Sequence, residues 1–332
     1  MQAFSPLFRS GHLMTLAAHF WPRGPDERRY PARARLYATA PGVQVLVQEQ
    51  HPAGEARGEF VLLHGLESSS RAGYMLSMAR AALEAGFSAH RVNIRSCGGT
   101  EHLCRTLYHS GLTEDLRFIL ETLRSEGRGP FFLMGYSLGG NLILKLAGEL
   151  GESARGLIAG VCAVSAPIDL LRCVKRLEAR ENSLYHSRFL RLMKKRMRLR
   201  HRLMPELFRI DGLDRVPSLY EFDDHITAPA FGFSGAEEYY RTQSAQRFLA
   251  RIRVPTLVVA AQDDPLVPFE MFRQVALGEN SLIELLAPQH GGHVGFLARG
   301  QPRFWLDQVA IEWACSLCVP QAHAPRTEQP SA

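Results

Sequence analysis

Ser137 is the residue of this sequence whose setting most favours chemistry. A Gly-x-Ser-x-Gly motif spans residues 135–139, directly after an apolar run that begins at Phe131 and directly before a helical pattern that starts at Asn141. A sharp strand-to-helix turn needs small neighbours, lifts the hydroxyl out of the sheet and directs the first amides of the helix toward developing negative charge. A glycine-rich turn with an incidental serine is the alternative, but the position between strand and helix favours a nucleophile.

Residues that could activate Ser137 follow it along the chain. A serine hydroxyl needs a base to remove its proton, and the base needs a carboxylate to orient it. The chain carries two adjacent acids, Asp263 and Asp264, and later two histidines, His290 and His293. Serine, acid and histidine in this order, each on a loop after a strand, are the arrangement of the α/β-hydrolases. This pattern predicts a Ser-His-Asp triad that works through an acyl-enzyme intermediate.

Spacing favours the second member of each pair. Asp264 begins an Asp-x-x-Val-Pro segment, which is usual for the triad acid in this fold, whereas Asp263 would be a loop cap or turn residue. His293 follows two glycines, which allow its loop to fold the imidazole back over Ser137. His290 would then lie at the rim of the site.

Two backbone amides are expected to form the oxyanion hole, which stabilises the tetrahedral intermediate. Leu138 directly follows the nucleophile and supplies one amide. Leu66, at the end of an earlier strand, supplies the other. Their side chains have no part in this role.

The elements that must position these residues alternate between strand and helix, which predicts a mostly parallel, eight-stranded sheet flanked by helices. Periodicity is lost over about residues 169–235, and we interpret this segment as a helical cap inserted beside the site. We expect one domain over residues 1–320, followed by a disordered tail over residues 321–332. The predicted strands cover residues 35–39, 43–50, 59–64, 87–95, 131–136, 156–165, 255–261 and 281–286, and helices are expected over 74–85, from 113, from 141 and over 302–317.

The 332-residue chain has a net charge of +6 and is 46% hydrophobic, which is ordinary for a globular protein with a sizeable core. No apolar stretch reaches the roughly 18 residues that span a bilayer, and the start of the chain lacks a secretory pattern, so we expect a cytoplasmic protein. The spacing of Cys315 and Cys318 lacks a second pair for a zinc site. The predicted chemistry requires no metal or organic cofactor.

Basic residues concentrate in residues 172–209, where leucine and methionine alternate with them. One interpretation is a solvated helical face. The other is peripheral contact with an anionic membrane through the cap, at the inner face of a membrane. Nucleic acid is not an expected partner, because no recognition module accompanies the basic run.

At these residues the chain resembles the YheT-like family of α/β-hydrolases, a family of esterases related to eukaryotic, membrane-anchored phospholipase-type proteins. The resemblance covers most of the chain and implies the triad Ser137, Asp264 and His293. It is carried by Pro6-x4-Gly11-His12-x2-Thr15, His64-Gly65-Leu66-Glu67-x-Ser69-Ser70, Asn93-x-Arg95-x-Cys97-Gly98-Gly99, Tyr108-His109-Ser110-Gly111-x-Thr113-Glu114-Asp115-Leu116, Gly135-Tyr136-Ser137-Leu138-Gly139-Gly140-Asn141, Phe222-Asp223-Asp224-x2-Thr227, Tyr239-Tyr240, Asp263-Asp264-Pro265 and Gly291-Gly292-His293-x-Gly295-Phe296.

Two departures from the family pattern bear on the rim of the site. Ser96 replaces a glycine that is usual after the arginine, and the opening hairpin lacks the expected Asp-Gly turn. The membrane span of the eukaryotic relatives is also missing from this sequence, so anchorage does not carry over. The change at Ser96 and the altered hairpin turn both lie outside the predicted triad.

The expected activity is hydrolysis of a carboxylic ester with a hydrophobic acyl chain, on a small-molecule or lipid substrate. A thioesterase, amidase or acyltransferase would use the same residues. The alternative from another class is a non-catalytic binding or scaffold protein on a hydrolase fold.

Overall fold

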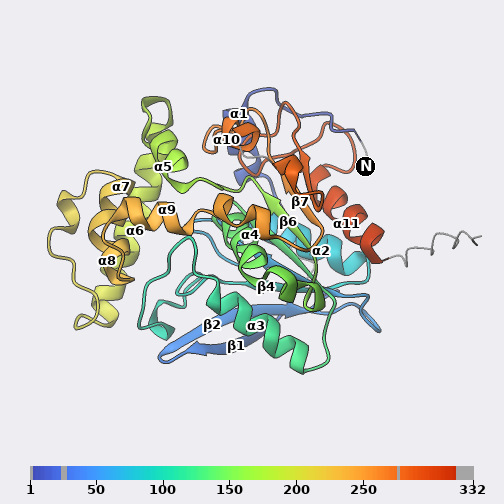
Figure 1. Ribbon diagram of the computed structural model, residues 1–332, viewed down its shortest axis with the longest axis horizontal. Helices are drawn as coiled ribbons and strands as arrows, with labels where there is room; N and C mark the ends of the chain where they lie inside the picture. The colour runs from blue at the N-terminus through green and yellow to red at the C-terminus, as the bar shows by residue number, and fades with distance from the viewer. Residues whose placement is uncertain (1–2, 24–27, 275–276, 319–332) are drawn as a thin grey trace, which may run out of the picture.

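A single eight-stranded sheet runs through the protein in the computed structural model, which describes residues 3–23, 28–274 and 277–318 (Figure 1). The strand order is β1-β2-β4-β3-β5-β6-β7-β8. β2 is antiparallel to both of its neighbours, and all other neighbouring strands are parallel. The predicted mostly parallel, eight-stranded sheet is therefore confirmed. The strands are β1 (Arg33–Ala40), β2 (Val43–Gln50), β3 (Glu59–Leu63), β4 (Ser88–Val92), β5 (Phe131–Tyr136), β6 (Ile158–Val164), β7 (Thr256–Val259) and β8 (Ile283–Leu286).

Several predicted strands are longer than the observed ones, because apolar residues continue into the loops that form the site. β4 was expected to reach residue 95 but ends at Val92. The chain turns there, since the Asn93 side chain accepts a hydrogen bond from the Ser70 amide and donates one to the Leu46 carbonyl. The polar residues after this end, Asn93, Arg95 and Ser96, are themselves buried, so polarity does not separate the strand from the loop that follows it.

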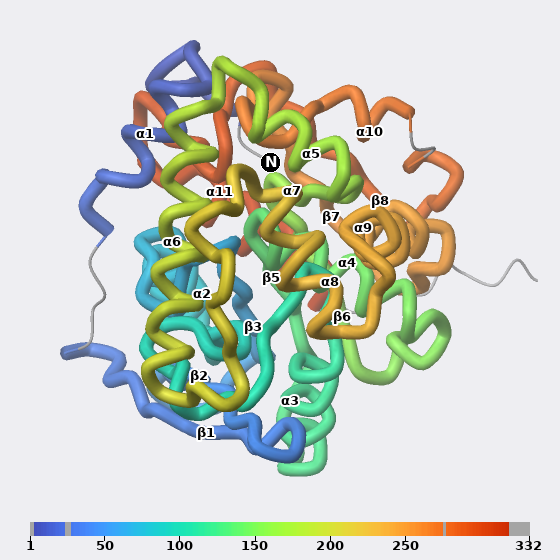
Figure 2. Tube along the Cα trace, turned by 90° about the vertical axis from the view of Figure 1, so that its left-hand side faces the viewer, coloured from blue at the N-terminus to red at the C-terminus, as the bar shows by residue number. Residues whose placement is uncertain are grey.

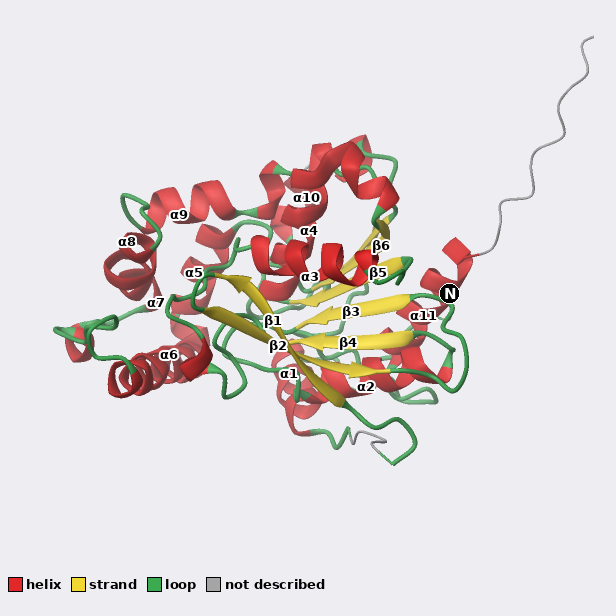
Figure 3. Ribbon diagram, turned by 90° about the horizontal axis from the view of Figure 1, so that it is seen from below, coloured by secondary structure: helices red, strands yellow, loops and turns green. Residues whose placement is uncertain are grey.

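Helices cover both faces of the sheet and bury alternate side chains of its strands (Figure 3). One layer contains α3 (Glu114–Ser125), α4 (Leu138–Leu150) and α10 (Glu270–Gln274), which pack on Val61 and Leu133. The other contains α2 (Gly73–Glu84) and α11 (Trp305–Cys318), which pack on Leu62 and Met134. The period-two alternation of the strands thus supplies two cores, one on each side.

A group of helices lies between β6 and β7 in the chain and stands at one end of the sheet (Figures 1 and 2). We call these helices, together with the turns that join them, the cap. The division into a hydrolase domain and a cap insertion at about 169–235 stays a prediction, and the predicted tail lies outside the described residues. The cap contains α5 (Leu170–Glu178), α6 (Ser183–Leu203), α7 (Leu219–Phe222), a π-helical turn (Asp223–Thr227), α8 (Ala228–Ala230) and α9 (Ala236–Gln243).

The start of α3 is tied to α4 and is not capped by its own side chain. Thr113 occupies the N-cap position, but its side chain makes no capping hydrogen bond. Its hydroxyl donates instead to Glu149 of α4, at 2.6 Å. The first turn of α3 is acidic, with Glu114 and Asp115 near the positive end of the helix dipole.

Candidate active site

Ser137 lies on a strained turn between β5 and α4. Its φ of 53° and ψ of −120° are in a region that side chains with a Cβ rarely adopt. The turn closes because its glycines leave no room for side chains: a Cβ on Gly135 would lie 2.3 Å from the Gly139 carbonyl oxygen, and one on Gly139 would lie 2.6 Å from the Leu63 oxygen. This packing holds the serine hydroxyl at the carboxyl end of the sheet.

The structure brings Ser137, His293 and Asp264 into one hydrogen-bonded chain. The Ser137 Oγ lies 3.0 Å from Nε2 of His293, and Nδ1 of the same imidazole lies 2.9 Å from Oδ2 of Asp264. The Asp264 carboxylate is buried, and its Oδ1 also accepts hydrogen bonds from the amides of Leu266 and Val267. A carboxylate held in this way can orient the imidazole so that Nε2 accepts the serine proton.

The other acid and the other histidine form a separate pair. His290 Nδ1 lies 3.2 Å from Oδ2 of Asp263. Oδ1 of Asp263 accepts hydrogen bonds from the amides of Gly291 and Gly292, both at 2.9 Å. The structure therefore places Asp263 as the residue that fixes the loop before His293, in line with its interpretation as a loop cap.

A third support of the histidine loop comes from α1 (Gly11–Phe20). The Thr15 hydroxyl accepts a hydrogen bond from the His293 amide at 2.8 Å and donates one to the Gly11 carbonyl. A Cβ on Gly292, whose φ is 58°, would lie 2.5 Å from that same Gly11 oxygen. Sequence reasoning assigned no role to Thr15, although the motif Gly11-His12-x2-Thr15 pointed to this segment.

The two amides predicted for the oxyanion hole both belong to residues that line the cavity beside Ser137. Leu138 is the first residue of α4, where an amide has no acceptor within its own helix. The amide of Leu66 has no hydrogen-bond partner among the residues that the structure describes, whereas that of neighbouring Gly65 donates to the Tyr74 hydroxyl.

A buried histidine holds the loop that carries Leu66. His64 accepts a hydrogen bond from the Ile94 amide at Nε2, so Nδ1 carries the proton and donates to the Gly65 carbonyl. Complete burial lowers the pKa of His64 to about 4, which keeps the ring neutral. The His64 ring is therefore a neutral spacer fixed by its two hydrogen bonds.

The departure at Ser96 has a structural counterpart. Ser96 is buried with a φ of 55°, in the left-handed region that favours glycine. Its carbonyl accepts a hydrogen bond from the Arg196 side chain of α6 at 2.6 Å. The serine is thus part of the seam between the sheet loops and the cap.

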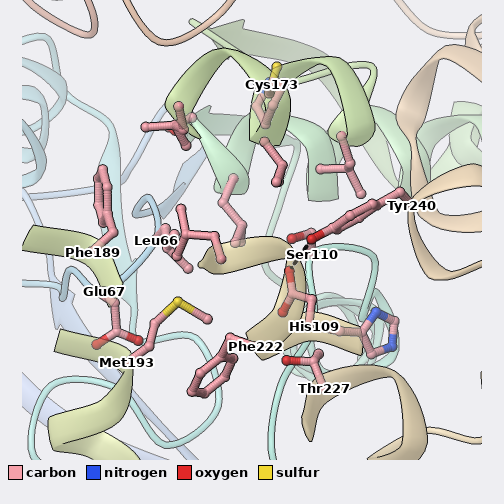
Figure 4. A pocket seen from close by; sticks show the side chains of 18 of the residues that line it. Leu66, Glu67, His109, Ser110, Cys173, Phe189, Met193, Phe222, Thr227 and Tyr240 are labelled. Carbon is pink, nitrogen blue, oxygen red and sulfur yellow. Dashed lines mark hydrogen bonds between the residues drawn. The ribbon is translucent and has the colours of Figure 1, made fainter. Parts of the chain in front are cut away.

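A cavity of about 120 Å³ opens from Ser137 and His293 into the space under the cap (Figure 4). Most of its wall is apolar, and the side chains come from both the sheet loops and the cap. The wall includes Leu66, Leu107, Leu170, Cys173, Val174, Leu177, Phe189, Met193, Met197, Leu219, Phe222 and Val267.

One part of the cavity wall is polar, and sequence reasoning missed it. Asp223 lies in the π-helical turn and accepts a hydrogen bond from the Tyr240 hydroxyl at 2.7 Å. Burial raises the pKa of Asp223 to about 6. Nearby, Tyr239 bonds to Ser110, and the same side of the cavity holds His109 (Figure 4). The motif around residues 222–227 was the available signal, but spacing alone does not show that it faces the cavity.

Comparison with known proteins identifies the family of this chain. The chain matches the Alpha/beta hydrolase family over residues 60–307. It is 32% identical over 314 residues to YheT of Escherichia coli (strain K12), whose name classes it with the esterases; the match covers 92% of this chain and 90% of YheT.

A eukaryotic relative and a solved structure extend the comparison. Phospholipase ABHD3 of Mus musculus is 29% identical, with 83% of this chain and 70% of that protein covered. The structure of the Pyrococcus furiosus esterase Pf2001 superposes with a TM-score of 0.58 at 16% identity, covering 96% of this chain and 99% of that one, and supports the fold alone. The chain therefore belongs to the α/β-hydrolases and, within them, to the YheT-like family of esterase- and lipase-type enzymes.

Proposed function

We propose that this protein is a serine hydrolase that cleaves a carboxylic ester through Ser137, His293 and Asp264. The observation that carries the proposal is the continuous hydrogen-bonded chain from Asp264 through His293 to Ser137, at the mouth of an apolar cavity. A structural serine would not need a strained turn, a hydrogen-bonded base and an empty space beside its hydroxyl.

In the proposed reaction, Ser137 attacks the ester carbonyl while Nε2 of His293 takes the hydroxyl proton. The imidazolium then gives this proton to the leaving alkoxide, and the acyl group stays on Ser137. A water molecule, deprotonated by the same imidazole, attacks the acyl-enzyme and releases the acid. Asp264 keeps Nδ1 protonated throughout and stabilises the imidazolium.

The amides of Leu66 and Leu138 are proposed to stabilise the oxyanion that forms in both steps. The position of the two amides supports this role. Each amide belongs to a residue that lines the cavity beside Ser137, and neither has a hydrogen-bond acceptor among the described residues. The α4 dipole adds partial positive charge at the same point.

The proposed substrate is an ester with a hydrophobic acyl chain, because the cavity wall is mostly leucine, valine, methionine and phenylalanine. The names of two relatives, an esterase and a phospholipase, agree with ester or lipid substrates. Thioesters, amides and acyl transfer would use the same residues, so they are included as competing substrates in the test.

A fluorophosphonate probe tests the nucleophile directly. Ser137 Oγ would form a bond to phosphorus and expel fluoride, which raises the intact mass by one phosphonyl group. We expect labelling of the wild type and of Ser187→Ala, an exposed serine of α6, and no labelling of Ser137→Ala. Labelling of folded Ser137→Ala at the same rate would remove the assignment, and an unlabelled wild type would favour a binding or scaffold protein.

We further propose that the cap side contacts an anionic membrane peripherally. Leu13, Leu16 and Phe20 of α1 are exposed, and α1 lies against α6, where His12 contacts Tyr185 at 3.3 Å (Figure 2). Arg188, an exposed basic residue of α6, lies 3.4 Å from His19 of α1, so positive charge adjoins this apolar surface, as expected for a helix at an anionic interface. Among the described residues, no helix combines the length and apolarity needed to cross a bilayer.

A further inference from the structure

Two arginines of α6, Arg196 and Arg200, lie one turn apart, and among the described residues only Arg196 contacts a carboxylate. Arg200 is the one that is fully buried and lines the cavity. Arg196 donates from Nε and Nη2 to the carboxylate of Glu67, with a second carboxylate, that of Glu101, 3.5 Å away. Arg200 has no carboxylate within 4 Å among the residues that the structure describes. A buried, unpaired cation is costly, so this difference needs an explanation.

Arg200 is held firmly although its charge is not balanced. Its side chain is fully buried, Nη1 donates to the Thr106 carbonyl at 3.0 Å, and the guanidinium lies over the Phe208 ring at 4.7 Å. Nε and Nη2 make no hydrogen bond. These two atoms form the edge of the guanidinium that binds carboxylates and phosphates in a bidentate manner.

Other arginines of this protein show what that edge binds. Arg95 uses Nε and Nη2 to hold the two carboxylate oxygens of Asp115, at 2.9 and 2.7 Å. Arg196 uses the same two atoms for Glu67. Arg95 and Arg196 thus pair this edge with a carboxylate, whereas the same edge of Arg200 has no hydrogen-bond partner among the residues that the structure describes.

The titratable groups around Arg200 do not supply a hidden counter-ion. The titratable groups close enough to affect the charge of Arg200 are Cys104, Arg196, Cys97 and Tyr108. Burial raises the pKa of the Cys97 thiol to about 12 and raises that of the Tyr108 phenol well above its usual value, so both are neutral. Burial lowers the pKa of Arg200 itself, but a guanidinium stays charged at neutral pH.

The position of Arg200 connects this charge to the cavity. Phe189, Met193, Met197 and Arg200 all line the cavity, and their spacing of four, four and three residues places them on one helix face. Along α6 the stripe extends roughly 16 Å, with three apolar side chains followed by the cation. A molecule that lies along this stripe meets apolar side chains first and a positive charge last.

We propose that Arg200 binds an anionic group of the substrate, a carboxylate or a phosphate, through its free Nε and Nη2 edge. The inference rests on the proposed ester hydrolysis and narrows its substrate class to esters that carry a negative charge at a distance from the scissile carbonyl. The anion can belong to either side of the ester: a terminal carboxylate of the acyl chain or a phosphate of the alcohol.

Matched substrate pairs test both sources. For the acyl side, mono-4-nitrophenyl esters of linear dicarboxylic acids are compared with esters of monocarboxylic acids of equal length. For the alcohol side, 1-acylglycerol 3-phosphate is compared with 1-acylglycerol. The readout is the ratio of kcat/KM for the charged and the uncharged member, and we expect the wild type to prefer the charged member in one arm, with an optimum in chain length.

Variants of α6 test whether Arg200 causes the preference for the charged substrate. Arg200→Met should reduce the ratio by at least about tenfold, since a hydrogen bond to a charged group is lost. Arg200→Lys should keep part of it, and Arg198→Met, an exposed arginine two residues away, should keep all of it. An Arg200→Met protein with the wild-type ratio, or a wild type without preference in either arm, overturns the proposal.

Binding without turnover separates this proposal from the proposed hydrolysis. Octyl phosphate and azelate should raise the Tm of the wild type more than octanol does, and Arg200→Met should lose the difference. This result can hold even if no ester is cleaved and no probe labels Ser137. If Arg200→Met does not fold, the wild-type comparison decides: an equal effect of octanol and the two anions overturns the proposal.

Discussion

The two sides of the cavity position their functional groups in different ways. On the sheet side, close backbone contacts fix the residues: Ser137 has a strained φ, and Gly135, Gly139 and Gly292 leave no space for a Cβ. On the cap side, buried ionisable side chains set the shape, with Asp223 and Arg200 both inside the wall. Backbone fixation gives the precision that bond making needs, whereas buried charge gives selectivity for polar groups of a ligand.

The largest expected effects concern the sheet side, where the two Asp–His pairs can be compared directly. Asp264→Asn and His293→Ala should each reduce kcat by a factor on the order of 10⁴ or more, because the base loses its orientation or is removed. Asp263→Asn and His290→Ala should cost far less, since that pair only supports the loop. Steady-state kinetics on a 4-nitrophenyl ester measure both, and the reverse ranking would exchange the roles of the pairs.

Backbone fixation itself is tested by Gly139→Ala. The new Cβ would lie 2.6 and 2.7 Å from the carbonyl oxygens of Leu63 and His64, so the nucleophile turn must move away from β3. A displacement of this kind should reduce kcat/KM by about 10²-fold. Gly278→Ala is the matched control, because a Cβ there meets no heavy atom of the described residues within 4 Å. Full activity of folded Gly139→Ala would show that the turn tolerates more movement than its geometry indicates.

On the cap side, Asp223 should make stability depend on pH. Burial raises its pKa from 3.8 to about 6, so the folded state binds more protons than the unfolded state between these values. The contribution of Asp223 to the free energy of unfolding is therefore complete below about pH 4 and is lost as the pH rises through about 6. The difference amounts to about 3 kcal/mol.

Denaturant unfolding of the wild type and Asp223→Asn from pH 4 to pH 7 measures this contribution, because the amide mimics the protonated acid without titrating. The wild type should lose stability relative to the variant over this range. Asp214→Asn, at an exposed carboxylate of the cap, should run parallel to the wild type. Parallel curves for wild type and Asp223→Asn would contradict a buried, shifted acid.

The smallest effect is expected from the outer face of the cap. Replacing the exposed Arg191, Lys195 and Arg202 by Gln should weaken activity on anionic vesicles by a few-fold, with the difference shrinking as salt is added. Hydrolysis of a small ester in solution should stay unchanged. If the wild type and the variant are equally active on vesicles at low ionic strength, these residues do not bind the membrane and form only a solvated helical face.

The elements on the sheet side of the cavity could be predicted from the sequence, because short segments of neighbouring residues determine them. A strand followed by Gly-x-Ser-x-Gly, and the chain order of Ser137, Asp264 and His293, reflect turns and loops of a few residues each. The eight strands followed from apolar runs, although their ends shifted where buried loops continue the apolar pattern.

The cap could not be predicted in the same way, because partners there come from distant segments. Arg196 and Arg200 belong to the same basic run, and the sequence does not distinguish their surroundings. Tertiary packing places Glu67 and Glu101 beside Arg196. Of the two interpretations of the basic run, the solvated helical face does not describe these two arginines, because Arg200 is fully buried and the Arg196 side chain is only 14% exposed. The four-four-three spacing after Phe189 was the available signal that Arg200 belongs to the apolar side.

The contact between Thr15 and the His293 amide joins residues 278 positions apart, and His293 is itself 156 positions after Ser137. During synthesis, which proceeds from the N-terminus, Ser137 and β1 to β6 leave the ribosome long before His293, the proposed base, is made. The nascent chain therefore lacks the proposed base while it is being made. The proposed activity can begin only when the last strands are in place and the newly made histidine loop docks on a helix that was among the first segments to emerge.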